Sequence, residues 1–192
     1  MQTDPTPSPV DKLATAGQPA PAGASAAAAS AESRRADARF MLTHPLHLIS
    51  LGFGAGLSRL APGAAGTLFA WAAFEVLNRY FTVLDWGLLI VVGFLGGIGI
   101  TGFTAKMLRS EDPPAIVWGE IVAFWLVLLM ITPIDFMGKF WAFVVFRFFD
   151  MVKPPPIRYF ERRFTGGFGI MLDDLIAAFF TLLVTALWRM SV

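Results

Sequence analysis

The chain has 192 residues, of which 56% are hydrophobic and 15% are charged, and its mean hydropathy is +0.63. Soluble domains carry about a quarter charged residues, so this composition indicates an integral membrane protein. The net charge of +1 gives no electrostatic basis for nucleic-acid binding. The absence of cysteine excludes disulfides, cysteine-ligated metals and a cysteine nucleophile.

Residues 1–40 differ in kind from the rest of the chain. They are rich in Ala, Pro and Ser, and include the run GASAAAAS. This run lacks the leucine-rich core of a signal peptide, and basic residues follow it. Because the segment has too little apolar content to offset the entropy of ordering, we expect residues 1–40 to be a disordered cytoplasmic tail. A membrane-embedded domain is then expected at 41–192.

Four apolar segments after the tail are candidate membrane helices, since a span needs about 20 mostly apolar residues. These segments are Pro62 to about Phe81, Trp86–Ala105, about Ile116 to Pro133, and Leu175–Trp188 extended backwards through the two aspartates to Gly169. A fifth segment, 136–151, is short for a full crossing. We therefore expect an all-α fold, a polytopic helical membrane bundle of about four to five membrane helices.

Polar residues within or beside these segments have structural interpretations. Glu75 and Arg79 share one helical face, and we expect them to form an internal ion pair rather than a catalytic pair. The spacing of His44 and His47 resembles a metal motif, but Pro45 lies between them and no acidic residue is near in sequence. We expect these histidines to be interfacial or helix-capping. The glycines of Trp86–Ala105 suit close helix packing.

The order of the segments predicts their orientation. If the tail is cytoplasmic and each of the five segments crosses, the loops at 106–115 and 150–169 are also cytoplasmic. These loops contain most of the basic residues outside the tail, as the positive-inside rule requires: Lys106, Arg109, Lys153, Arg158, Arg162 and Arg163. Four polar stretches that are distant in sequence then meet at one membrane face, which is how helical bundles assemble a site.

Five acids lie at this face: Asp112, Glu120, Asp150, Asp173 and Asp174. An acid inside a membrane helix costs about 2.5–3.5 kcal/mol on insertion scales, so a compensating cation is expected. Arg147 lies three residues before Asp150 and is positioned to pair with it, but basic partners are too few for all five acids. Mg²⁺, which prefers oxygen ligands, would satisfy the remainder. Alternatively, the acids simply favour helix N-termini.

Glycine turns near the acids could bind an anion. The runs APGAAG and GGFG each lead into a predicted helix, where free backbone N–H groups attract phosphate oxygens. Candidate phosphate-binding positions are the glycines of these turns and nearby basic side chains: Gly63, Gly66, Gly166, Gly167, Arg147, Lys153 and Arg158. Carboxylates for a metal beside donors for an anion predict metal-assisted phosphoryl chemistry.

Several other phosphatase chemistries are excluded. No D-x-D motif is present for an aspartyl-phosphate intermediate of the haloacid dehalogenase type, and two histidines are too few for the histidine-based lipid phosphatases. No Walker A motif occurs either.

Four ordered motifs closely resemble those of the bacterial phosphatidylglycerophosphatase A family. They are HPLHLISLGFGAGLSRLAPGAAGTL, EDPPAIVWGEIVAFW, FRFFDMVKPPPI and GGFGIMLDD. The resemblance covers about residues 43–190, nearly everything outside the tail.

The resemblance implies a magnesium-dependent enzyme of the bacterial inner membrane, multi-pass, with its active site facing the cytoplasm. Such an enzyme hydrolyses the lipid phosphatidylglycerophosphate to phosphatidylglycerol and phosphate. By motif, Mg²⁺ is expected on Glu120, Asp173 and Asp174, with Asp112, Asp150, Asp173 and Asp174 as the catalytic acids. Arg147 and Lys153 would neutralise phosphate charge, and Asp150 would orient Arg147. The expected partners are the lipid substrate and the membrane, with no nucleic acid.

One departure from the family pattern concerns the predicted metal site. The family motif I-V-x-D-E has an aspartate where this chain has Gly119. An alternative is therefore a noncatalytic or weakened homologue that binds anionic lipid, and restoring the acid with Gly119→Asp would then raise activity. A small transporter is disfavoured, because the polar residues gather at one interface rather than at mid-membrane.

Overall fold

The computed structural model describes residues 36–110, 112–152 and 164–191. Within these ranges the regular structure is helical, and no strand is present. Most of the predicted tail, 1–35, lies outside the described residues. The predicted end of the tail at residue 40 falls inside the first described helix, α3 (Ala38–Leu42).

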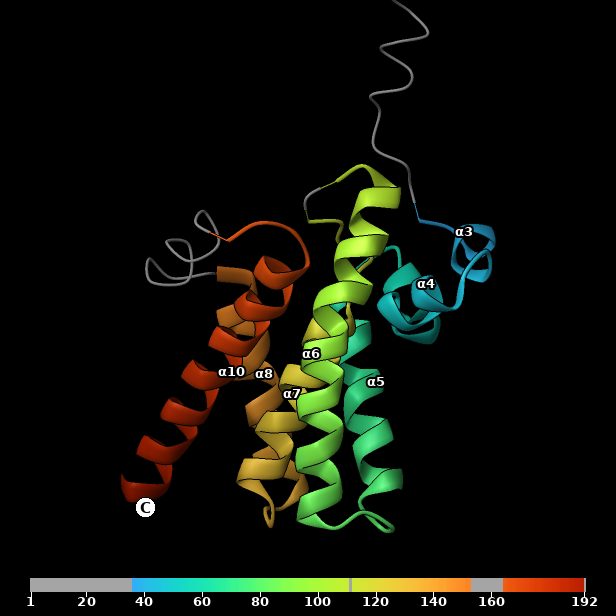
Figure 1. Cartoon of the computed structure of the whole chain (residues 1–192). Helices are drawn as coiled ribbons and strands as arrows, with labels where there is room; N and C mark the ends of the chain where they lie inside the picture. The colour runs from blue at the N-terminus through green and yellow to red at the C-terminus, as the bar shows by residue number, and fades with distance from the viewer. Residues whose placement is uncertain (1–35, 111, 153–163, 192) are drawn as a thin grey trace, which may run out of the picture. The chain divides into compact units, whose positions relative to one another are not determined.

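Five longer helices follow one another in the predicted order (Figure 1). They are α5 (Pro62–Leu77), α6 (Val83–Leu108), α7 (Trp118–Ile131), α8 (Phe136–Val152) and α10 (Gly166–Ser191). Each contains most of one predicted segment, so the helical nature of these segments is confirmed. The main difference is that α10 begins at Gly166, because the whole glycine turn belongs to the helix, whereas the segment was expected to extend back only to Gly169.

In the described part of the chain, three shorter helices precede α5: α3, α4 (Pro45–Ser50) and the 3₁₀ helix η1 (Gly52–Leu57). One of them, α4, packs against α6, whereas the other two pack against α4 (Figure 1). The Asp37 carboxylate caps α3 by accepting a hydrogen bond from the Phe40 N–H at 2.7 Å. His44 caps α4, since its Nδ1 accepts from the Leu46 N–H at 3.2 Å. The capping role expected for the histidines is thus confirmed for His44.

His47 joins α4 to α6 from a buried position. Its Nδ1 lies 3.0 Å from the Thr104 hydroxyl of α6, and its ring stacks on Phe40 at a centroid distance of 4.2 Å. Burial lowers the pKa of the His47 imidazole, and the neighbouring His44 lowers it further. A neutral imidazole held between an aromatic ring and a hydroxyl is therefore a packing element here.

Helix α7 is the centre of the helical packing. It contacts α5, α6, α8 and α10, and most of its side chains are buried. Two buried indoles anchor it to its neighbours: Trp118 Nε1 donates to the Gly93 carbonyl at 3.0 Å, and Trp125 Nε1 donates to the Ala70 carbonyl at 2.9 Å. Because α7 is enclosed by protein, its 14 residues need not match the thickness of a bilayer.

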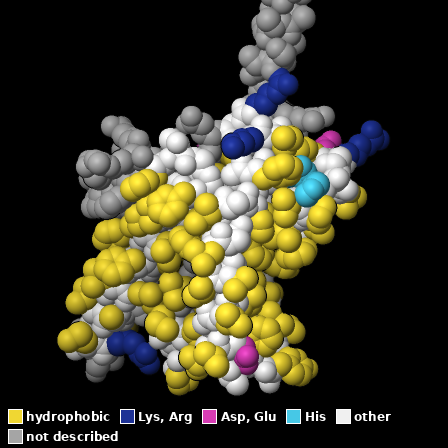
Figure 2. Space-filling model, viewed as in Figure 1, with side chains coloured by type: hydrophobic (Ala, Val, Ile, Leu, Met, Phe, Trp, Pro, Cys, Tyr) yellow, Lys and Arg dark blue, Asp and Glu magenta, His cyan; other side chains and the backbone are white. Residues whose placement is uncertain are grey.

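By length and composition, α6 and α10 could each cross a membrane. Both present large hydrophobic side chains on their outer faces, including Leu88, Leu95, Phe179 and Leu187. Figure 2 shows that hydrophobic side chains cover most of the visible face, whereas charged ones show near its upper and lower ends. Such a surface fits lipid contact along the helices and water at their ends.

Glycines allow α6 and α10 to pack with their backbones almost touching. A Cβ added to Gly167 of α10 would collide with the Ile98 carbonyl oxygen and lie 2.7 Å from the Gly102 nitrogen, both on α6. At Gly97, an added Cβ would lie 2.7 Å from the Met171 methyl group. Gly96 and Gly99, on the other side of α6, have no neighbour within 4 Å of such an atom. The predicted packing role is therefore confirmed for only some of the glycines.

Gly167→Ala should lower the melting temperature of the protein in detergent, because the added methyl group forces the two backbones apart. Overpacking of this kind costs about 1–3 kcal/mol. Gly96→Ala is the matched control, and it should leave the melting temperature unchanged or slightly raised, since alanine favours helix by about 1 kcal/mol. Equal melting temperatures for the two variants would contradict the close contact of α6 with α10.

Candidate functional site

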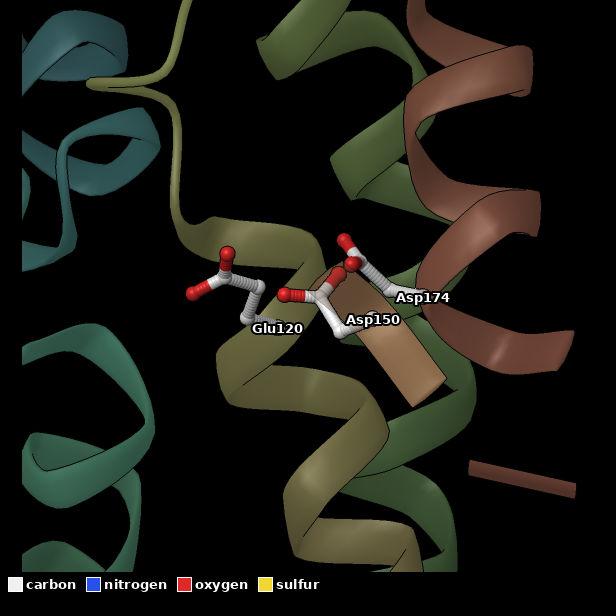
Figure 3. Close-up of side chains that lie close together, drawn as sticks. All are labelled: Glu120, Asp150 and Asp174. Carbon is white, nitrogen blue, oxygen red and sulfur yellow. The ribbon is translucent and has the colours of Figure 1, made fainter. Parts of the chain in front are cut away.

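Three carboxylates from three helices converge near one end of the helical packing (Figure 3). Glu120 lies in the first turn of α7, Asp150 near the end of α8, and Asp174 in the first third of α10. One carboxylate oxygen from each lies within 4.8 Å of the other two. We call these three residues the acid cluster.

Arg147 of α8 is the cation of the acid cluster. Its Nη1 lies 2.6 Å from Asp150 Oδ2 and 3.2 Å from Glu120 Oε1. The predicted pairing of Arg147 with Asp150 is thereby confirmed. All three side chains are about 15% exposed or less, so water screens the pair only weakly.

The acid cluster contains more negative charge than its arginine can balance. Asp174 is 7% exposed, and no hydrogen bond or ion pair joins it to a described residue. Glu120 Oε2 is also buried without a hydrogen-bond partner among the described residues. Buried carboxylate oxygens without partners carry a large desolvation cost. A second cation would remove this cost, and three oxygen donors form a ligand set that suits a hard divalent ion.

Asp173 does not belong to this cluster, although it was expected beside Asp174 in the metal site. Successive residues of an α-helix point about 100° apart, so the two side chains face different directions. Asp173 lines a neighbouring pocket of about 100 Å³ together with Asp112 and Gly166. The observed cluster therefore has Asp150 in the place expected for Asp173, and the five acids divide into two adjacent groups.

The glycines at the start of α5 lie directly against the acid cluster. A Cβ added to Gly63 would lie 2.7 Å from Arg147 Nη2 and 2.7 Å from Glu120 Oε2. One added to Gly66 would lie 3.3 Å from the same Glu120 oxygen. The turn expected to bind phosphate thus reaches the acids, and only glycine admits the charged groups so close to the helix.

The other predicted phosphate-binding residues have different surroundings. Gly166 lines the small pocket, with a backbone φ of 73° that favours glycine. Gly167 is explained by its packing against α6, described above. Lys153 and Arg158, together with Arg162 and Arg163, lie outside the described residues.

Gly119 provides the space that Asp174 occupies. An added Cβ at this position would collide with Asp174 Oδ2 and lie 3.4 Å from Met171 Sδ. The sequence showed only that an acid of the family motif is missing here. The position of Asp174 against Gly119 could not be inferred from the sequence, because the two residues lie on different helices and 55 positions apart.

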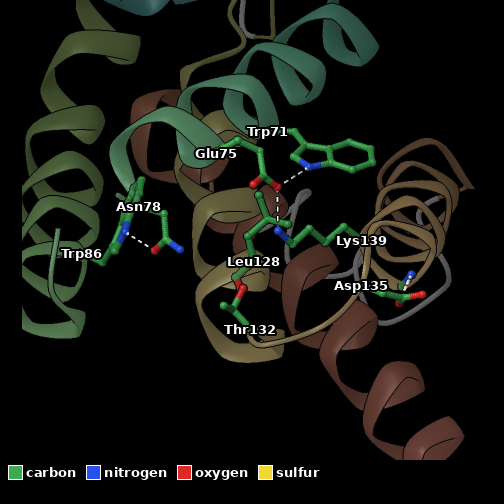
Figure 4. A network of polar contacts seen from close by, with 9 residues as sticks. Trp71, Glu75, Asn78, Trp86, Leu128, Thr132, Asp135 and Lys139 are labelled. Atoms are coloured by element: carbon green, nitrogen blue, oxygen red, sulfur yellow. Dashed lines mark hydrogen bonds and ion pairs between the residues drawn. The ribbon is translucent and has the colours of Figure 1, made fainter. Parts of the chain in front are cut away.

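A second polar network lies at the other end of the long helices (Figure 4). Glu75 of α5 accepts hydrogen bonds from Lys139 Nζ at 2.6 Å and from Trp71 Nε1 at 3.0 Å. The expected ion pair with Arg79 was therefore wrong: Arg79 lies beyond Asn78, the C-cap of α5, whereas α8 brings Lys139 next to Glu75. This network joins α5 to α8 and has a structural role.

The chain was then compared with known proteins. The family model described as phosphatidylglycerophosphatase A matches residues 48–189. The chain is 39% identical to phosphatidylglycerophosphatase A of Escherichia coli over 74% of its own length and 82% of that protein. It is 36% identical to phosphatidylglycerophosphatase A of Haemophilus influenzae, over 76% and 90% of the two chains.

A protein of Bacteroides thetaiotaomicron, named provisionally as a phosphatidylinositol-3-phosphatase, is 39% identical over 74% of this chain and 92% of its own. No solved structure matches the chain. The matched residues include every member of the acid cluster, the small pocket and the glycine turns. The family model and the similarity to full-length relatives together show that this chain is an enzyme of the phosphatidylglycerophosphatase A family.

Proposed function

We propose that this protein hydrolyses phosphatidylglycerophosphate to phosphatidylglycerol and inorganic phosphate. The observation that carries the proposal is the acid cluster: three largely buried carboxylates within 4.8 Å, with one arginine of the described residues between two of them. An anionic phosphate cannot approach such a group unless further positive charge is present. The membership of the family supports this lipid as the substrate.

Magnesium is the cation that we propose for this position. Glu120, Asp150 and Asp174 would hold it, since their oxygens converge and Glu120 Oε2 is buried with no hydrogen-bond partner in the described part of the chain. When bound, a divalent ion supplies Lewis acidity toward a phosphate and its attacking water. The site thus fits the metal, with Asp150 replacing Asp173 in the predicted ligand set.

Arg147 and the start of α5 are suited to bind the phosphate that is cleaved. The Nε of Arg147 is buried and has no hydrogen-bond partner among the described residues, so it remains available as a donor. Ala61 caps α5 without a side-chain hydrogen bond, which leaves the N–H groups of the first turn available. Because Gly63 has no side chain, an oxygen anion could reach both the helix end and the guanidinium.

Asp112 and Asp173 are suited to proton transfer beside this site. They line the same small pocket, next to the acid cluster, and belong to different parts of the chain. We infer that this pocket admits the glycerol headgroup or the attacking water, with either carboxylate able to accept a proton.

The proposed environment is the bacterial inner membrane, crossed several times, with the acid cluster on the cytoplasmic side. Support comes from the apolar outer faces of α6 and α10. Lys106 and Arg109 lie at the end of α6 from which the chain leads to the acid cluster, in keeping with the positive-inside rule. The shorter helices α5, α7 and α8 would complete the membrane domain.

Gly119 does not favour the noncatalytic alternative. The carboxylate of Asp174 fills the space beside Gly119, so the region still holds an acid despite the departure from the family motif. We infer that the remaining acids form a complete site in this chain.

Phosphate release from phosphatidylglycerophosphate should require Mg²⁺ and should fall by about 100-fold or more in Asp174→Asn, which removes one of the proposed ligands. Released phosphate would be measured with the full-length protein in detergent micelles, with and without EDTA. Asp135→Asn, which changes an exposed carboxylate in the cap of α8, is the control and should retain wild-type rates. Wild-type rates in Asp174→Asn, or full activity in EDTA, would contradict the proposed metal site.

Gly119→Ala should lower the rate of phosphate release by about tenfold or more, because the added methyl group displaces the Asp174 carboxylate. Gly119→Asp introduces the same Cβ, so we expect it to reduce activity as well, rather than to raise it as the motif alone predicts. The melting temperature of each variant shows whether the fold is retained. A Gly119→Asp enzyme faster than wild type would show that the position lacks a needed acid.

A further inference from the structure

A larger groove lies where α6 ends and α10 begins. It encloses about 760 Å³, and its lining includes Gly99, Gly102, Phe103, Lys106, Arg109 and Gly166. We call it the α6–α10 groove. None of its lining residues belongs to the acid cluster.

The α6–α10 groove carries two cations for which the described part of the chain offers no ion-pair partner. Lys106 and Arg109 are both exposed, and neither forms an ion pair with a described residue. Arg109 ends α6 in a left-handed conformation with φ of 54°, and its N–H bonds to the Ala105 and Lys106 carbonyls. In contrast, Arg147 is engaged by two acids and Lys139 by Glu75. Within the described ranges, the groove is therefore a site of positive charge that no acid balances.

The groove is continuous with the small pocket of the proposed active site. Thr165 and Gly166 line both of them. The small pocket is also lined by Asp112 and Asp173, whereas the groove is also lined by Lys106 and Arg109. One ligand that occupied both spaces would meet acids in the small pocket and cations in the groove.

The apolar wall of the groove opens toward the lipid-facing side of α6. Nothing lies within 4 Å of a Cβ added to Gly99, so no other described residue covers the helix surface there. Phe103 is 36% exposed beside it, and Leu95 is 63% exposed one turn earlier. A lipid could thus place a polar group at the cations while its acyl chains remain among the exposed side chains of α6.

We propose that the α6–α10 groove binds the phosphodiester group of the lipid substrate, with Lys106 and Arg109 as its cationic partners. The inference rests on the proposed function, since phosphatidylglycerophosphate carries two phosphates joined by glycerol. The terminal monoester is cleaved, whereas the inner diester is retained in the product and needs its own binding site. The groove would then distinguish this lipid from phosphatidic acid, which has the monoester but no diester.

Binding of the product tests the groove without requiring catalysis. The probe is short-chain phosphatidylglycerol, titrated calorimetrically into the full-length protein in an uncharged detergent. Wild-type protein should bind it, and the Lys106→Gln, Arg109→Gln double variant should bind about tenfold more weakly or worse, because two charge-assisted contacts are lost. Arg39→Gln with Arg59→Gln removes two exposed cations elsewhere and should bind as wild type does. Equal affinity for wild type and the first variant, or no binding to wild type, would overturn the proposal that the groove binds the phosphodiester group.

Kinetics provide the second readout. In the Lys106→Gln, Arg109→Gln variant, KM for phosphatidylglycerophosphate should rise about tenfold with kcat nearly unchanged, because uniform binding is lost. KM for phosphatidic acid should stay the same, and an equal rise for both lipids would overturn the assignment to the diester. If wild-type protein hydrolyses neither lipid, the proposed function fails. The calorimetric comparison then still decides whether the groove binds the phosphodiester group.

Discussion

The excess of buried negative charge over positive charge is the constraint on which this structure depends. Arg147 lies between Glu120 and Asp150, whereas Asp174 has no cationic partner among the described residues. Leaving a buried carboxylate unpaired is among the more costly arrangements in a protein. The surrounding helices nevertheless hold the three acids together. The magnesium ion proposed above would balance the negative charge that Arg147 leaves uncompensated among the described residues.

The packing of the helices explains how the acids are held. Helix α7 lies among α5, α6, α8 and α10, so the start of α7 places Glu120 where three of these neighbours end or begin. Small residues permit the approach: Gly63 admits the arginine, and Gly119 admits Asp174. The indoles of Trp118 and Trp125 fix α7 through carbonyl groups of its neighbours. The apolar core thus determines the geometry of a polar site.

The helices were predictable because long apolar runs are a local property of the sequence. The meeting of the acids at one end was also predictable, since the alternating direction of successive helices brings Glu120 and Asp174 together. Which three acids form the cluster was not predictable, because this depends on how each helix is rotated about its own axis. Asp173 and Asp174, for example, point about 100° apart on α10, and only one of them faces the cluster. The predicted ion pair of Glu75 with Arg79 was wrong for a related reason. The observed partner, Lys139, is 64 residues away in sequence, and only tertiary packing brings it close.

The same reasoning changes the meaning of Gly119. Comparison with the family motif suggests that a metal ligand is missing at this position, because a motif compares residue types one position at a time. In three dimensions, the space beside its Cα is occupied by the Asp174 carboxylate, so a side chain at 119 and the observed position of Asp174 exclude each other. A fourth acid would also raise the buried negative charge opposite the same Arg147. The count and placement of the acids are therefore coupled, and the glycine belongs to an arrangement in which Asp174 lies against α7.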